Sequence, residues 1–180
     1  MQVISGNIRG LKLESAKNPD LRPTKDRIKK SLFDILRFKI QGKSFLDLFG
    51  GTGQIGIEAF SQGAGRIVII EKDEKTASLI KKNVSKIKNQ NNIEVYCQDA
   101  VKYLENEDLK FDIIFLDPPY QNAELLDDCI KNIMNLKYLP EVIAIESLTS
   151  KEIGIDNEKF YLRKKYHYGK ISLNLYEKTN

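Results

Sequence analysis

The stretch SFLDLFGGTGQIGIEAFSQGAGRIVIIE, residues 44–71, predicts the class of fold. Residues 44–49 read as a buried strand, the glycines after them permit a tight turn, and the apolar spacing from Ile55 to Ser61 favours a helix. Residues 66–71 are too short and too rich in β-branched side chains for a helix, so they predict a second strand. A strand, a helix and a strand in succession form a unit whose two strands run parallel.

The same alternation continues beyond residue 71. The expected elements are a helix capped by Asp73 and reaching Ile87, strands at 93–98, 111–117 and 141–147, and helices at 100–104 and 123–136. Residues 159–166 and 171–178 instead predict a terminal hairpin that turns near Tyr168 and Gly169. We therefore expect an α/β fold, with a mainly parallel sheet covered by helices on both faces.

The chain has 180 residues, which suits a single domain over residues 1–180. Residues 1–43 are expected to form a basic N-terminal extension to a Rossmann-like core at residues 44–180. In that extension we predict a hairpin that pairs residues 2–4 with 11–13, a loop at 17–23, and a helix capped by Thr24. No apolar run approaches the length of a membrane span, and the first residues lack a signal-peptide core, so we expect a cytoplasmic protein with no membrane partner.

Positive charge is concentrated at the N-terminal end. The net charge is +4, but residues 1–43 hold eleven Lys and Arg against four acids, a balance of +7, and the remainder carries −3. Positive charge concentrated at one end of the chain favours binding to a polyanion. Alternatively, these lysines and arginines form an ordinary solvated surface that binds no partner. The candidate phosphate contacts in this segment are Arg9, Arg22, Lys25 and Arg27.

The cysteines and the single histidine suggest no metal site. Cys97 and Cys129 are far apart and have no metal-ligand spacing, so we expect both to be buried and reduced. His167 lies in a basic, aromatic segment and is given no role.

Polar residues punctuate the predicted strand ends, where ligands bind in open α/β sheets. Gly51, Gly53 and Gly56 match the dinucleotide fingerprint, and Glu71 lies about twenty residues on, which keeps an NAD oxidoreductase as an alternative. Asp47 before the glycines suits a cationic amino group, and Asp99 ends the third predicted strand. A ligand with an adenine, a ribose and an aminoacyl tail would use all of these residues, and S-adenosylmethionine fits that description.

The tetrapeptide Asp117-Pro118-Pro119-Tyr120 ends the fourth predicted strand. Two prolines stiffen the backbone, so the Pro118 carbonyl becomes a fixed acceptor beside the Asp117 carboxylate, while Tyr120 supplies a flat ring. The two acceptors could bind the two hydrogens of an exocyclic amine, and the aromatic ring could stack on the planar base that carries it. Such an amine is a poor nucleophile, and holding its two hydrogens favours the pyramidal nitrogen that could attack a methyl group on sulfonium.

Four stretches together resemble the RsmD family of class I S-adenosylmethionine-dependent methyltransferases. They are SGNIRGLKLE (5–14), LRPTKDRIKKSLFDIL (21–36), DLFGGTGQIGIEAFSQGA (47–64) and YGKISLNLYE (168–177), with DPPY (117–120) between them. The resemblance implies a three-layer, Rossmann-like sandwich with a seven-stranded sheet and an antiparallel last strand. It also implies methylation of the N2 amine of a guanine in small-subunit (16S) ribosomal RNA.

The resemblance assigns roles to individual residues. Asp117, Pro118, Pro119 and Tyr120 would grip the guanine, with the Tyr120 hydroxyl dispensable because some relatives carry Phe there. The loop at Arg22 to Thr24 would close near cofactor and RNA. The expected cofactor contacts are Thr24, Asp47, Phe49, Gly50, Gly51, Thr52, Gly53, Glu71 (ribose), Lys72, Asp99 (adenine) and Ala100.

The expected partner is small-subunit ribosomal RNA in a 30S assembly particle, bound by a monomer. An N6-adenine DNA methyltransferase, which carries a similar tetrapeptide and flips its base, remains an alternative. A non-catalytic RNA-binding module is a further one.

Overall fold

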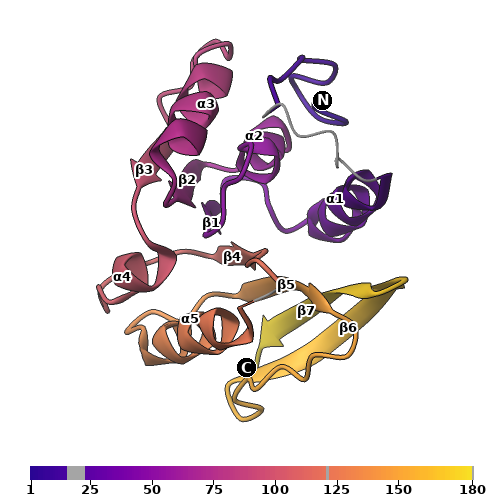
Figure 1. Ribbon diagram of the computed structural model, residues 1–180, viewed down its shortest axis with the longest axis vertical. Coiled ribbons are helices and arrows are strands. Elements are labelled where there is room, and N and C mark those ends of the chain that lie inside the picture. Colours follow the sequence, from indigo (N-terminus) through magenta and orange to yellow (C-terminus); the bar gives the residue numbers. More distant parts are fainter. Residues whose placement is uncertain (16–22, 121, 180) are drawn as a thin grey trace.

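The computed structural model describes residues 1–15, 23–120 and 122–179, and these contain a seven-stranded sheet in the order β3-β2-β1-β4-β5-β7-β6 (Figure 1). The strands are β1 (Ser44–Asp47), β2 (Arg66–Glu71), β3 (Ile93–Cys97), β4 (Ile113–Leu116), β5 (Val142–Leu148), β6 (Phe160–Tyr168) and β7 (Ile171–Lys178). Strands β1 to β5 pair in parallel, whereas β7 runs antiparallel to both β5 and β6. The predicted mainly parallel sheet with an antiparallel last strand is confirmed.

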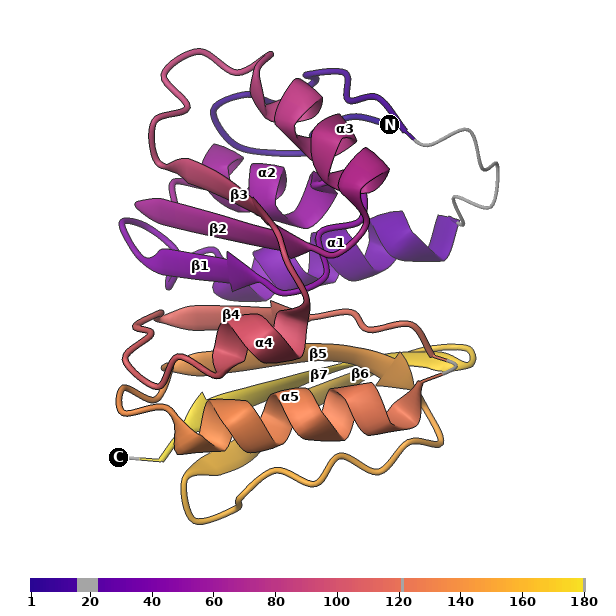
Figure 2. The same cartoon turned by 60° about the vertical axis from the view of Figure 1, so that its left-hand side comes forward.

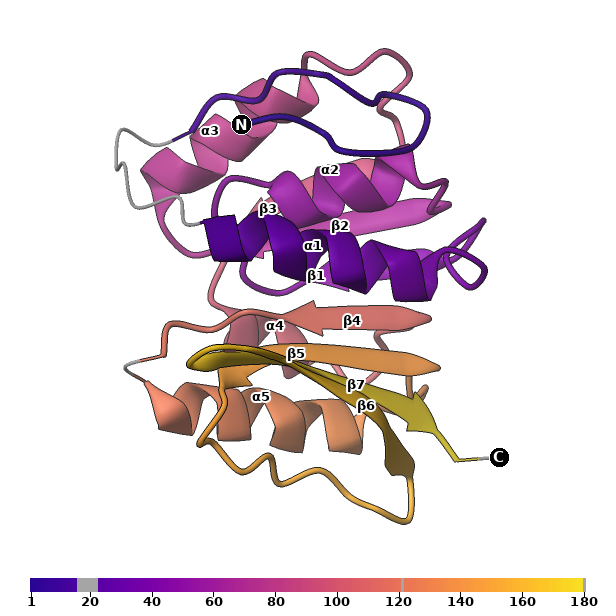
Figure 3. The ribbon, with the colours of Figure 1, turned by 90° about the vertical axis from the view of Figure 1, so that its right-hand side faces the viewer.

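Helices cover both faces of this sheet (Figures 2 and 3). They are α1 (Pro23–Leu36), α2 (Gln54–Ser61), α3 (Glu74–Val84), α4 (Ala100–Leu104) and α5 (Ala123–Asn135). Side chains alternate between the two faces along each strand, so Phe45 packs in the buried cluster under α1 to α3 and Leu46 in the cluster under α4 and α5. The molecule is therefore the expected three-layer sandwich.

The N-terminal segment is part of the buried core. The predicted pairing of residues 2–4 with 11–13 is present as one antiparallel bridge outside the named strands, between Gln2 and Lys12, and the Val3 N–H donates to the Leu11 carbonyl at 3.0 Å. Val3 and Leu13 are buried beside α1. The fully buried Glu58 carboxylate of α2 accepts hydrogen bonds from the backbone N–H of Ile4 (3.0 Å) and Ser5 (2.9 Å). A buried carboxylate without hydrogen-bond partners would destabilise the fold. Detaching the segment from α2 would remove these two bonds, so they hold the segment in place.

Several element boundaries differ from the sequence predictions by one to three residues, among them those of α1, β1 and α3. Helix α1 begins at Pro23, so Thr24 lies inside the helix and not at its cap, in agreement with the preference for proline at the first helical position. Strand β1 ends at Asp47, which leaves Leu48 and Phe49 to the glycine loop. Helix α3 ends at Val84, three residues before the expected end, although Asp73 caps it as predicted.

The prediction for the two cysteines was half wrong. Cys129 of α5 is buried, but Cys97 is exposed. Cys97 is the last residue of β3, and β3 forms one edge of the sheet, so its end has no neighbouring strand on that side. An apolar-looking run at an edge strand is only partly covered.

Among the helices that the structure describes, none combines the length and the apolar character needed to cross a lipid bilayer.

Candidate active site

A cavity of about 300 Å³ opens at the carboxyl ends of β1 to β4. We call it the main cavity. Residues from four different strand ends meet there because parallel strands all terminate at the same edge of the sheet. The predicted site residues on its wall are Phe49, Gly51, Glu71, Lys72, Asp99, Ala100 and the segment 117–120.

The glycine loop makes room beside Glu71. Gly51 has φ of 54°, and a Cβ added there would meet nothing closer than the Phe49 carbonyl oxygen at 4.0 Å, so the loop leaves open space at this point. The Glu71 carboxylate accepts hydrogen bonds from the backbone N–H of Gly51 (2.9 Å) and Asp73 (2.9 Å). Glu71 is thus held at the loop, with acceptor capacity remaining on its two oxygens.

Gly53 serves a different purpose. It precedes α2 with φ of 76°, and a Cβ there would lie 2.8 Å from Ile80 Cγ2 of α3. The third fingerprint glycine, Gly56, similarly packs against Ile69 of β2. These two glycines therefore allow close packing of helices and strands, and neither lines the main cavity.

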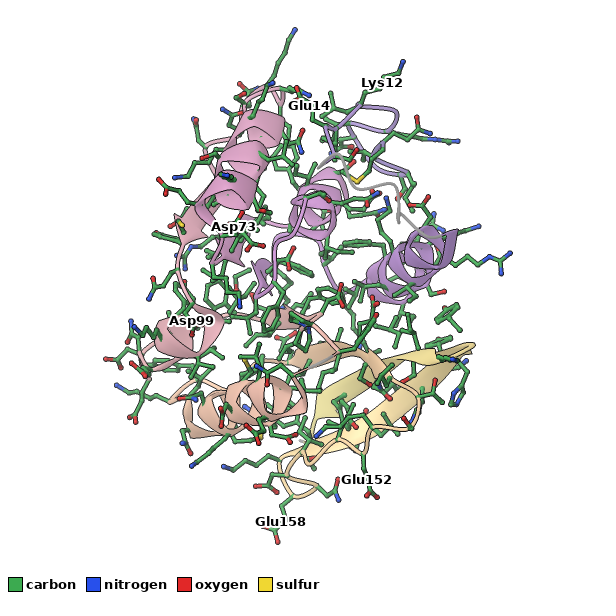
Figure 4. The ribbon with its side chains drawn as sticks, in the orientation of Figure 1. Lys12, Glu14, Asp73, Asp99, Glu152 and Glu158 are labelled. Atoms are coloured by element: carbon green, nitrogen blue, oxygen red, sulfur yellow. The ribbon has the colours of Figure 1, made fainter. Side chains whose placement is uncertain are left out.

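Asp99 connects the third strand to the next helix. Its Oδ1 caps α4 by accepting from the backbone N–H of Val101 (3.0 Å) and Lys102 (3.2 Å). Figure 4 shows Asp99 at the start of α4 and Asp73 at the start of α3. The cap fixes Asp99 and the neighbouring Ala100 at the wall of the main cavity.

A smaller hollow of about 70 Å³ adjoins the main cavity on the side of α1. We call it the α1 hollow. Ile28 and Lys29 of α1, Gly50 to Thr52 of the loop, and Asp117 line it, together with Glu146 of β5. Phe49, Gly51 and Asp117 line both spaces. The Asp117 segment therefore stands where the two spaces meet.

Asp47 lies beneath the glycine loop, and it is not among the residues that line either space. Its side chain is 1% exposed, and its Oδ2 accepts from the backbone N–H of Gly56 at 3.2 Å. Oδ1 is buried without a hydrogen-bond partner among the described residues. Burial raises the pKa of Asp47 to about 7.

We expect Asp47→Asn to stabilise the protein at pH 8 more than at pH 5. The folded-state pKa of about 7 exceeds the usual 3.8, so the native state binds the proton more tightly than the unfolded chain does. The wild type therefore loses stability as pH rises from about 4 to about 7, by on the order of 2–4 kcal/mol, and the neutral amide escapes this loss. Urea unfolding at both pH values measures the difference.

Asp73→Asn is a control for which the stability should depend on pH in the opposite direction. Hydrogen bonds from the Thr76 side chain and backbone lower the pKa of Asp73, so its contribution to stability is lost as pH falls. A stability difference between Asp47→Asn and wild type that does not change with pH would contradict the expectation for Asp47.

Glu146 is a site residue that sequence reasoning missed. It is 3% exposed, lies in β5, and accepts a hydrogen bond from the Tyr120 hydroxyl. The predicted strand at 141–147 contained it, but nothing in that apolar run marked one acid as special. The Tyr120 hydroxyl, expected to be dispensable, has a partner in the structure.

The predicted RNA contacts do not lie together. Arg9 is exposed at the tip of the N-terminal segment, where Asn7 N–H bonds the Ser61 carbonyl at 2.8 Å at the far end of α2. Arg27 is exposed near the start of α1, next to Ile28 and Lys29 of the α1 hollow. Arg22 lies outside the described residues, as do the side chains of Thr24 and Lys25.

His167 is exposed on β6, away from the main cavity. In the part of the chain that the structure covers, no three His, Cys, Asp or Glu side chains are grouped to hold a metal ion.

The main cavity fits S-adenosylmethionine better than a dinucleotide. A dinucleotide places its pyrophosphate at the N-terminus of the helix after the glycines. Here the buried Asp47 carboxylate already accepts the Gly56 N–H in the first turn of α2. A pyrophosphate there would lie beside a carboxylate, whereas S-adenosylmethionine has no phosphate groups and avoids this contact.

The sequence matches a known family over almost its whole length. The family model described as Conserved hypothetical protein 95 matches residues 1–177. A Buchnera aphidicola relative named Ribosomal RNA small subunit methyltransferase D is 34% identical over 166 residues, covering 91% of this chain and 86% of the relative. The Haemophilus influenzae protein of the same name is 32% identical over 182 residues, covering 98% and 93%. A solved Escherichia coli structure, of a protein assigned as a methyltransferase, has a TM-score of 0.87 at 29% identity and covers 99% of this chain and 97% of that one.

Proposed function

The chain belongs to the Conserved hypothetical protein 95 (RsmD) family, and from this premise we propose that it methylates the N2 amine of a guanine in small-subunit ribosomal RNA. The cofactor is S-adenosylmethionine, which when bound supplies an electrophilic methyl group on a positively charged sulfur. We propose that the whole chain acts as one methyltransferase domain, because its N-terminal segment shares the buried core.

The observation that carries this proposal is the position of residues 117–120. They follow β4 and line the main cavity, and Asp117 also lines the α1 hollow. In this proposal Glu71 holds the ribose of the cofactor, and Asp99 with Ala100 holds the adenine. The Gly50–Thr52 loop holds the methionine part near Asp117. The reacting amine then lies between Asp117 and the cofactor.

Residues 117–120 prepare the amine for the reaction. The Asp117 carboxylate and the Pro118 carbonyl accept the two amine hydrogens, so the nitrogen lone pair turns away from the base ring and toward the cofactor. Tyr120 stacks on the base. One charged hydrogen bond contributes about 1.5–3 kcal/mol and stacking about 1–3 kcal/mol, but fixing the nitrogen at the right distance contributes more to the rate.

The proposed partner is a small-subunit assembly particle, met in the cytoplasm by a monomer. Relatives named small subunit methyltransferase D support an rRNA substrate. Incubating the protein with labelled S-adenosylmethionine and small subunits that lack methylation, then mapping the labelled nucleotide, tests the proposal. Label on adenine in DNA, with none on the RNA, would favour the N6-adenine DNA methyltransferase. No label at all, with NAD bound in calorimetry, would favour the oxidoreductase.

We expect Arg27→Glu to weaken RNA binding and to flatten its salt dependence. Arg27 is exposed on α1 and directly precedes Ile28 and Lys29, which line the α1 hollow, and we propose that a phosphate near the target base passes it. Each lost phosphate contact lowers the slope of log K against log salt by about 1. Filter binding of the target RNA between 50 and 200 mM salt, about the range where such contacts are weakened, measures both quantities.

Arg9→Glu makes the same charge change at the far end of α2 and is the matched control. If the two substitutions weaken RNA binding equally, the RNA is attracted by the total charge of the protein and makes no specific contact with Arg27.

A further inference from the structure

Glu146 in β5 and Asp117, directly after the end of β4, occupy matching places at two neighbouring parallel strands. Ile145 of β5 pairs with Leu116 of β4, and the two acids are the next residues along each strand. Both residues line the α1 hollow, so they share one small space. Glu146 also lines a second hollow of about 50 Å³ between residues 118–120 and the end of β5. One buried carboxylate therefore lies behind the tetrapeptide that is proposed to hold the base.

The bases differ at the edge that would meet this carboxylate. Guanine carries an N1–H donor next to its N2 amine, whereas the corresponding ring nitrogen of adenine is an acceptor. An ionised carboxylate only accepts hydrogen bonds. If Asp117 and the Pro118 carbonyl hold the amine, the adjoining N1–H still needs an acceptor, because an unpaired polar group in a closed site is costly.

We propose that Glu146 accepts the N1–H of the target guanine and thereby selects guanine over bases that present an acceptor at that position. This assignment rests on the proposed function. It makes Glu146 a specificity-determining residue that contacts the substrate beside the reacting amine. Nothing in the reaction requires Glu146 to gain or lose a proton.

Tyr120 is the positioning residue for this carboxylate. Its hydroxyl donates to Glu146 Oε1. A carboxylate offers about four acceptor positions, so one such group can accept from a hydroxyl and from a base at the same time. The ring of Tyr120 and its hydroxyl thus have separate tasks, which explains why the hydroxyl is not idle in this chain.

The test compares two target bases in the same particle. Small subunits are reconstituted with guanine or with 2-aminopurine at the mapped nucleotide; 2-aminopurine keeps the amine but has an acceptor in place of N1–H. We expect the wild type to favour guanine in kcat/KM by about 10- to 100-fold, the effect of one charged hydrogen bond. For Glu146→Gln we expect this preference to fall to near unity, because the amide can donate to the acceptor of 2-aminopurine.

Two variants separate recognition from a structural role. Tyr120→Phe should reduce the preference for guanine in the same direction but less, because the carboxylate remains. Glu58→Gln alters another fully buried carboxylate, on α2, and should leave the preference unchanged even if the rate falls. The melting temperature and the S-adenosylmethionine dissociation constant of Glu146→Gln should match those of the wild type.

If Glu146→Gln slows methyl transfer to both bases equally and the preference for guanine is unchanged, the role assigned to Glu146 is wrong, but the proposed function still stands. A wild type that transfers no methyl group to the guanine particle would instead refute the proposed function itself.

Discussion

Asp117→Ala should reduce methyl transfer by about 10³-fold or more while S-adenosylmethionine binds within a few-fold of wild type. The carboxylate is proposed to hold one amine hydrogen and to fix the nitrogen beside the methyl group, an arrangement needed only when the base is present. Asp117 stands where the main cavity meets the α1 hollow, so its loss affects the amine more than the adenosine half of the cofactor. Single-turnover methylation and calorimetry measure the two effects separately.

Two substitutions calibrate that result. Asp117→Asn keeps one acceptor oxygen, so its rate of methyl transfer should lie between those of Asp117→Ala and the wild type. Asp108→Ala removes an exposed acid paired only loosely with Lys137, at 3.4 Å, and should change neither quantity. Turnover of Asp117→Ala within tenfold of wild type would disprove the proposed role of the carboxylate.

The fold was predictable because its signals are local. Buried parallel strands such as residues 66–71 read as short β-branched runs, and the glycine loop separates the first strand from its helix. Parallel strands then bring Glu71, Asp99 and Asp117 to one edge whatever the detailed packing. This explains why most of the proposed cofactor contacts line the main cavity.

Glu146 was not predictable because its importance depends on register. It lies 26 residues after its partner Tyr120, in a strand that reads as core. Only the alignment of β4 with β5 places it next to Asp117. No local pattern in residues 141–147 distinguishes an acid that faces a hollow from one at a solvated strand end.

Asp47 and Arg9 show the same limit in different ways. Strand β1 ends earlier than expected, so the loop passes over Asp47 and the carboxylate bonds Gly56 beneath it. Arg9 belongs to the basic N-terminal end by sequence, but the hydrogen bond from the Asn7 N–H to the Ser61 carbonyl places the chain around Arg9 beside the far end of α2. A count of charge along the chain carries no information about which edge of the sheet each charge faces.

Glu71→Ala should weaken cofactor binding by about 100-fold. The carboxylate is proposed to accept hydrogen bonds from the ribose hydroxyls, each worth about 1.5–3 kcal/mol when one partner is charged. Part of the loss has a second source, because Glu71 also accepts from the backbone N–H of Gly51 and Asp73 and so steadies the glycine loop. Calorimetry with S-adenosylhomocysteine measures the total effect.

A ligand without the hydroxyls separates the two sources. The 2′-deoxy form of S-adenosylhomocysteine lacks one ribose donor, so Glu71→Ala should weaken its binding less than that of the parent ligand, as in a double-mutant cycle. Glu74→Ala, an exposed acid in the first turn of α3, should leave both affinities unchanged. If Glu71→Ala weakens both ligands equally, the carboxylate acts only by holding Gly51 and Asp73, and the ribose must be bound by other groups of the main cavity.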